Sequence, residues 1–257
     1  MVMVKIYLFC LLFVCLSCSS YVVKDENSEE KLNSVVEYIK QEKYSKAKIE
    51  IEYLLLLDPL SNFAGDAQYY LSDCYFYLNN YGQAITEYSK YLSRQDSKDE
   101  FVKKAKYMLC KCYFNMSLDF KKDQTDTVIA IEKLQNFIEE DIMSDYISEI
   151  ENMILNLRNK LAKKDFYTAS LYIKLEEIES ANIYYLSIID NYYDTDYVND
   201  ALLNMTLLCF INDNDAEEFL KNYKNNFLTN DDYEDTMALI KNLSLSEDYD
   251  YYISLLK

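Results

Sequence analysis

The stretch AQYYLSDCY, residues 67–75, and the stretch AKYMLCKCY, residues 105–113, carry alanine, tyrosine, leucine, cysteine and tyrosine at matching positions. The last tyrosines, Tyr75 and Tyr113, are 38 residues apart, and Tyr38 precedes Tyr75 by 37. An alanine follows such a tyrosine after nine residues in three places: Tyr38 and Ala47, Tyr75 and Ala84, Tyr172 and Ala181. The spacing predicts a repeated pair of helices in which the aromatic residue packs over a small residue where the two helices cross closely.

Glycine and proline are almost absent, with 2 and 1 in 257 residues. Average usage is about 7% glycine and 5% proline. Strands and tight hairpins depend on glycine at positive φ, so this depletion favours helices joined by Asn- and Asp-rich turns. The sequence therefore predicts an all-α fold.

The period of 34 to 38 residues resembles that of tetratricopeptide repeats. Units are expected over residues 28–61, 65–97 and 103–141, the third with its internal turn lengthened by Phe120–Asp126, between Tyr113 and Ala130. One long helix is expected over 144–176, followed by a helix over 180–192 and a shortened pair over 197–226. Together they predict a superhelical array of about five tetratricopeptide-like helix pairs with one long central helix.

The N-terminus has the features of a secretory leader. Lys5 precedes an unbroken apolar run, Ile6–Leu16, which is too short to span a membrane. Residues 15–18, CLSC, resemble a bacterial lipobox with cysteine where leucine is usual. This indicates a signal peptide over 1–17 and acylation, as with palmitate, of Cys18, which would then head a polar tether over 18–30. The alternative is ordinary secretion with a coincidental cysteine.

The formal net charge of −18 disfavours nucleic-acid binding. With no histidine, histidine-dependent triads and histidine–metal sites are excluded, and two glycines cannot form a phosphate-binding loop. We therefore predict no enzyme, no cofactor and no metal site. For Cys74, Cys110, Cys112 and Cys209, buried free thiols are favoured over a disulfide.

The order of several motifs resembles the BamD-like outer-membrane protein assembly lipoproteins. The most specific frame has Leu161-Ala162, acidic Asp165, Ala169, Tyr172, Asp194-Thr195 and Asp200-Ala201-Leu202. The resemblance implies a lipid-anchored scaffold on the periplasmic face of the outer membrane. Its implied partners are a BamA-like barrel insertase and unfolded outer-membrane proteins, and its only membrane contact would be the N-terminal lipid.

The resemblance implies that residues 31–141 bind the client and that residues 142–227 dock the machinery. Residues 228–257 are expected to form an acidic tail or an extra helix. The first helices of stacked pairs line a concave face. Counting along them places an aromatic trough at Tyr69, Asp73, Phe76, Tyr77, Tyr107, Lys111 and Phe114. The alternative is that these aromatic residues pack unit against unit.

The sequence departs from the family at the expected docking helix. Members carry arginine there, whereas Ser180–Asn191 holds no basic residue, and Glu176 stands where a turn glycine is usual. A different tetratricopeptide envelope lipoprotein, such as a pilus-assembly or Tol–Pal-type scaffold, is the alternative function.

Overall fold

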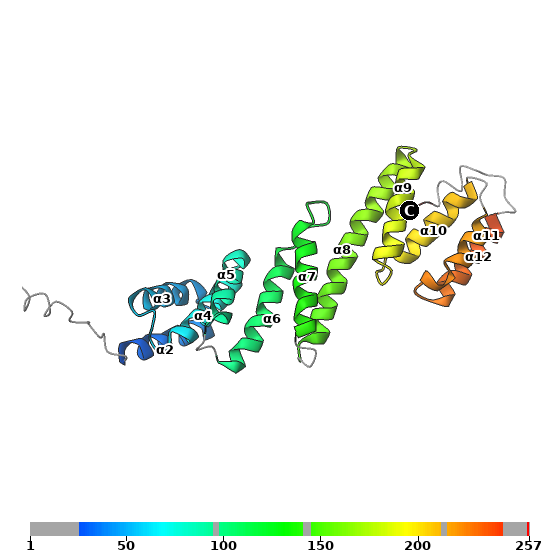
Figure 1. The fold of residues 1–257 in the computed structure, drawn as a ribbon. Helices are drawn as coiled ribbons and strands as arrows, with labels where there is room; N and C mark the ends of the chain where they lie inside the picture. Colours follow the sequence, from blue (N-terminus) through cyan, green and yellow to red (C-terminus); the bar gives the residue numbers. More distant parts are fainter. Residues whose placement is uncertain (1–25, 95–97, 141–144, 212–214, 244–255, 257) are drawn as a thin grey trace, which may run out of the picture. The chain divides into compact units, whose positions relative to one another are not determined.

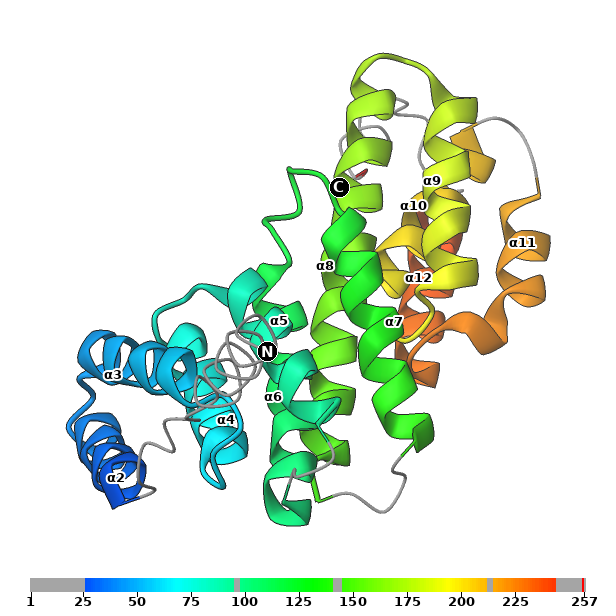
Figure 2. The same ribbon diagram turned by 60° about the vertical axis from the view of Figure 1, so that its left-hand side comes forward.

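The computed structural model describes residues 26–94, 98–140, 145–211, 215–243 and 256. These residues form eleven α-helices and one short 3-10 helix, with no strand (Figures 1 and 2). The predicted all-α class is confirmed. The signal peptide, Cys18 and most of the tether lie outside the described residues.

The chain divides into two compact units, one ending at Val102 and the other beginning at Lys103. Unit 1 contains α2 (Glu26–Lys40), α3 (Tyr44–Leu57), α4 (Ala64–Tyr77) and α5 (Tyr81–Leu92). Each of these helices packs against the next. The interior of the first three is apolar and includes Val35, Ile51 and Leu54.

The boundary between the units falls near the start of α6 (Asp99–Met116). In unit 2 this helix is followed by α7 (Thr125–Glu140), α8 (Ile147–Lys174), α9 (Ile178–Asn191) and α10 (Val198–Ile211). The 28-residue α8 is the expected long helix, and it packs against both α7 and α9 (Figure 1). The largest buried cluster of the described chain joins α8, α9 and α10 to the C-terminal helices.

The described residues after α10 form further helices. After α11 (Ala216–Asn222) and the 3-10 turn η1 (Lys224–Asn226), α12 spans Asn230–Leu243. Its start is capped because the Thr229 hydroxyl accepts from the Asp232 backbone N–H at 3.2 Å. Its buried residues include Tyr233, Met237 and Ile240, so the helix contributes to the core of unit 2.

Three helix pairs share one turn geometry. At the end of each first helix the residue four after the repeat tyrosine has positive φ: Glu42 at 56°, Asn79 at 58° and Glu176 at 61°. The tyrosine carbonyl accepts from the N–H five residues on, as in the 2.8 Å bond from Lys43 to Tyr38. This is a Schellman motif, which satisfies the last carbonyls of a helix and usually places glycine at the left-handed position.

The small residues of the repeat lie at corresponding places in the second helices. Ala47, Ala84, Ala130 and Ala181 are each 0% exposed. Their partner tyrosines, Tyr38, Tyr75, Tyr113 and Tyr172, are all partly buried. In the third helix pair the connection between α6 and α7 is eight residues long. The Gln124 amide holds it by donating to the carbonyl of Asp119 at 2.8 Å.

Glycine at the left-handed positions should stabilise the protein. We expect Glu42→Gly to raise the free energy of unfolding by about 0.5–1 kcal/mol. Relief of a left-handed strain of about 1–2 kcal/mol exceeds the added entropy of the unfolded chain, about 0.4–1 kcal/mol. Urea unfolding followed by circular dichroism measures the change. The control Lys40→Gly, in the last turn of α2, should lower the same free energy, and equal effects would contradict the argument.

Candidate functional site

The trough residues expected in unit 1 divide into buried and accessible groups. Tyr69 is 1% exposed, its ring stacks on Phe101 at 4.6 Å between centroids, and Tyr91 meets it edge-on at 5.5 Å. Asp73 is buried and accepts a hydrogen bond from the Tyr88 hydroxyl. Both side chains therefore face the interior between α4 and α5.

Phe76 and Tyr77, one turn further along α4, lie at the surface end of this helix. Tyr77 is 49% exposed and stacks on Tyr44 at 4.6 Å between ring centroids. Phe76 is partly buried, and its ring meets those of Tyr77 and Tyr81 edge-on. We call Tyr44, Phe76, Tyr77 and Tyr81 the aromatic cluster of unit 1.

The corresponding residues of unit 2 show the same division. Tyr107 is 8% exposed and stacks on Tyr146 at 4.1 Å, so it packs inside the unit. Lys111 is partly exposed and forms an ion pair with Glu149 at 3.7 Å. Phe114 is partly buried. Of the residues predicted to bind a peptide, Phe76, Tyr77, Lys111 and Phe114 are at least partly accessible, whereas Tyr69, Asp73 and Tyr107 are buried.

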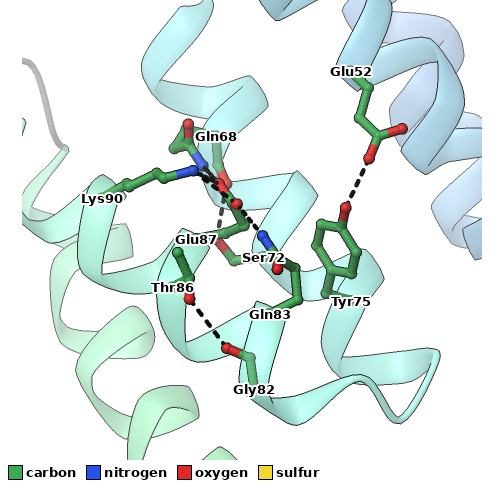
Figure 3. Close-up of polar contacts among 9 residues, drawn as sticks. All are labelled: Glu52, Gln68, Ser72, Tyr75, Gly82, Gln83, Thr86, Glu87 and Lys90. Atoms are coloured by element: carbon green, nitrogen blue, oxygen red, sulfur yellow. Dashed lines mark hydrogen bonds and ion pairs between the residues drawn. The ribbon is translucent and has the colours of Figure 1, made fainter.

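A polar network that the sequence did not reveal lies between α4 and α5 (Figure 3). Glu87 is 4% exposed and accepts from the Gln68 amide at 2.6 Å and the Gln83 amide at 2.7 Å. The Lys90 ammonium group donates to the same carboxylate at 2.9 Å. A buried charge with three donors is satisfied, and its role here is to fix the pairing of the two helices.

The Asp194-Thr195 frame has a structural role in unit 2. The Arg158 guanidinium of α8 donates to both carboxylate oxygens of Asp194 at 2.9 Å and to the Asn191 carbonyl at 2.8 Å. Thr195 is fully buried, and its hydroxyl donates to the Tyr192 carbonyl. These bonds attach the turn between α9 and α10 to the long helix. The frame therefore marks a packing arrangement rather than an exposed site.

Asp165, the acidic residue of the family-like motif, is costly to ionise in the folded protein. Asp165 lies on α8 and accepts from the Ser187 hydroxyl of α9 at 2.9 Å. Burial raises the pKa of the Asp165 carboxyl, and this hydrogen bond only partly offsets the effect. The folded state thus holds the proton more tightly than the unfolded state does.

Asp165→Asn should therefore stabilise the protein at neutral pH. Because the folded-state pKa is raised, the contribution of this carboxyl to stability falls as pH rises from the unfolded value of 3.8 through the folded one. The amide oxygen of asparagine still accepts from Ser187. Urea unfolding should show the variant more stable than the parent at pH 7, and the difference should shrink below pH 3.8. At pH 7 the exposed control Asp190→Asn should change the free energy of unfolding by less than about 0.5 kcal/mol.

Unit 2 also holds a surface hollow of about 620 Å³ along α8. Its lining combines lysine with aromatic and apolar side chains: Lys163, Phe166, Tyr167, Ser170, Leu171, Lys174 and Tyr197. Tyr167 is 54% exposed and Leu171 is 55% exposed. The sequence did not reveal this hollow, because Tyr197 joins the six residues of α8 only through the turn after α9.

The expected docking helix, α9, presents an acidic and apolar outer face. Ile183 is 67% exposed, and Glu179 and Asp190 are also exposed. Arginine, the family's usual residue there, is absent from α9. Arg158 of α8 binds the end of α9, because its guanidinium donates to the Asn191 carbonyl at 2.8 Å.

The thiols and acids of the described chain form no metal or redox centre. Cys74, Cys110 and Cys112 are buried free thiols, and Cys209 is a partly buried one. Burial raises the pKa of Cys74 and of Cys110 to about 12, which keeps both protonated. No cluster of three metal-binding side chains occurs within the described ranges. Nor is any described helix long and apolar enough to cross a membrane.

Consecutive helix pairs with shared turns and small residues at equivalent positions define a helical-repeat protein of the tetratricopeptide-like class. The family model YfiO, described as outer membrane lipoprotein, matches residues 24–208. The chain therefore belongs to the YfiO family of outer membrane lipoproteins. No curated protein gave a significant match to it.

Proposed function

We propose that this protein is a lipid-anchored scaffold of the machinery that assembles β-barrel proteins in the outer membrane. The observation that carries the proposal is the family match across residues 24–208, which takes in helices from both units. The helical-repeat fold supports a role in holding other proteins, because stacked helix pairs offer binding surfaces to a partner. Cys18 would carry the lipid, on the periplasmic face of the outer membrane.

The client would be an unfolded outer-membrane protein, bound through a segment with an aromatic anchor. The aromatic cluster of unit 1 supports this assignment because Tyr77 is half-exposed and its ring is already stacked on Tyr44. Rigid aromatic side chains contribute most to recognition when a partner covers them. Lys111 and Phe114 of unit 2 would offer a separate contact to a client.

Unit 2 would dock a BamA-like barrel insertase. The hollow along α8 supports this part of the proposal, since it combines two lysines with exposed aromatic and apolar residues. Docking would use Lys163 and Lys174 of α8 instead of an arginine on α9. The acidic outer face of α9 favours the second candidate, a pilus-assembly or Tol–Pal-type scaffold, because it departs from the family's docking residue.

Capture from the native envelope tests the proposal. The affinity-tagged lipoprotein is crosslinked in cells, solubilised gently and purified for mass spectrometry, with Lys163→Glu/Lys174→Glu as a matched variant. A stoichiometric barrel insertase that is lost with the variant supports the assembly role. Pilus or Tol–Pal components in its place would overturn it and support the alternative.

Client binding is tested at Tyr77. A peptide with the aromatic C-terminal segment of a β-barrel protein from the same envelope should bind Tyr77→Ala about tenfold more weakly than the parent. Fluorescence anisotropy of the labelled peptide measures the affinity. Tyr53→Ala is the matched control, because Tyr53 has the same exposed fraction, 49%, and lies outside the aromatic cluster. Equal affinities of parent and Tyr77→Ala would refute binding at the cluster.

A further inference from the structure

The helix α3 is apolar on two opposite faces. One face, with Ala47, Ile51 and Leu54, is buried in unit 1. The opposite side, which we call the outer face of α3, consists of exposed residues: Ile49 at 61%, Tyr53 at 49%, Leu56 at 79%, Leu57 at 53% and Leu60 at 92%. Their spacing of three and four residues forms one continuous stripe, with Leu60 in the turn just after the helix. Soluble monomers rarely expose a continuous apolar stripe, and such stripes usually mark a contact with a protein or a membrane.

The stripe lies near the end of unit 1 where the chain arrives from the N-terminus, and this position indicates what covers it. The turn of Gln41–Lys43 joins α2 to α3, and the Lys31 ammonium lies 4.5 Å from the Tyr53 ring centroid. This contact places the first turns of α2 beside the last turns of α3. Leu56, Leu57 and Leu60 therefore lie at the end of the helix pair where the chain arrives from Cys18.

The chain between Cys18 and Glu26 limits how far unit 1 can lie from an acylated Cys18. Even fully extended, it spans at most about 30 Å. The apolar end of α3 is thus held close to the lipid surface. The acyl chains of a lipidated Cys18 would give stable attachment by themselves, so a further contact would orient unit 1 rather than anchor it.

The composition of the face suits the boundary between lipid headgroups and acyl chains. Leucine and isoleucine can enter the acyl region, while a tyrosine ring and lysine side chains are typical of the interface. Lys31 lies over the Tyr53 ring, and Lys46 is exposed one helical turn before Ile49 and Glu50. A helix that lies flat in the headgroup region needs an apolar face flanked by lysines. It does not need the length of a helix that spans the membrane.

We propose that the outer face of α3 rests on the membrane that receives the Cys18 lipid, as a second membrane contact that orients unit 1. The proposal rests on the lipid anchoring included in the proposed function. The proposed partner of the outer face of α3 is a phospholipid surface. A protein partner on the same face is the competing outcome.

Fluorescence of a single tryptophan tests this contact, because the chain contains no tryptophan of its own. The full-length processed lipoprotein is prepared as Leu60→Trp and, for the control, as Leu228→Trp, an exposed leucine of unit 2. Each is reconstituted into vesicles of phosphatidylethanolamine and phosphatidylglycerol, with or without bromine on the acyl chains. Flotation first shows whether the protein is attached to the vesicles.

Brominated lipid should quench the Leu60→Trp emission and leave that of Leu228→Trp unchanged. The emission of Leu60→Trp should also shift to shorter wavelength on reconstitution. Adding Leu56→Gln to Leu60→Trp should weaken the quenching while circular dichroism stays unchanged, since Leu56 is largely exposed. Flotation without quenching would overturn the membrane contact and leave a protein partner for the face. Failure to float would refute the lipid anchor, and the inference with it.

Discussion

Tyr69→Ala is expected to lower the free energy of unfolding by about 3–5 kcal/mol, the range for removing a large aromatic side chain from a core. Tyr69 is 1% exposed and packs against the rings of Phe101 and Tyr91. Removal leaves a cavity that α4 and α5 cannot close, because the Glu87 network fixes their pairing. Urea unfolding monitored by circular dichroism measures the loss.

Two controls separate packing from surface effects. Tyr69→Phe keeps the ring and should cost less than about 1.5 kcal/mol, as for other shape-conserving substitutions. Tyr77→Ala removes an equal volume from the surface and should cost about 0.5–1.5 kcal/mol, the value of its stacking on Tyr44. Similar losses for Tyr69→Ala and Tyr77→Ala would contradict the assignment of Tyr69 to the interior.

The difference in burial between Tyr69 and Tyr77 determines which variants can test peptide binding. A loss of binding in Tyr69→Ala would follow from unfolding whether or not a client touches α4. Tyr77 and Phe76 give an interpretable result, because the exposed ring of Tyr77 can be removed while the buried face of the helix is kept. The same reasoning favours Lys111 over Tyr107 in unit 2, since Tyr107 is stacked on Tyr146.

The helices could be predicted from sequence because local signals agreed with the fold. Depletion of glycine and proline excluded strands, and the period of tyrosine and alanine located the pairs. The expected long helix over 144–176 compares with Ile147–Lys174 in the structure. The turns were less visible. Glu42 and Glu176 occupy left-handed positions without the glycine that normally marks them.

The candidate surfaces were harder to predict, because counting along one helix does not say what covers each side. Tyr69 and Tyr77 both fell on the expected trough, yet one is buried by α5 and its neighbours and the other is half-exposed. The outer face of α3 was missed for a related reason. The run of leucines from Leu54 to Leu57 goes around the helix, so that Leu54 is buried whereas Leu56 and Leu57 point to water.

The close crossing of α8 and α9 gives the second large effect. Ala169 of α8 and Ala181 of α9 are each 0% exposed and belong to the same buried cluster, together with Tyr185. Ala181→Leu forces three additional carbon atoms into this contact. We expect a loss of about 1–3 kcal/mol, the usual cost of overpacking a core. The resulting shift of α9 should also loosen the Arg158–Asp194 contact in the following turn.

Asp190→Leu is the matched control, because Asp190 is exposed on the same helix and accepts the same new side chain without entering the core. Its free energy of unfolding should stay within about 0.5 kcal/mol of the parent value. Urea unfolding of both variants measures the difference. An Ala181→Leu protein as stable as Asp190→Leu would mean that alanine is not required at the crossing. The tyrosine–alanine spacing would then reflect helix periodicity alone, and the repeat would be defined by its Schellman turns.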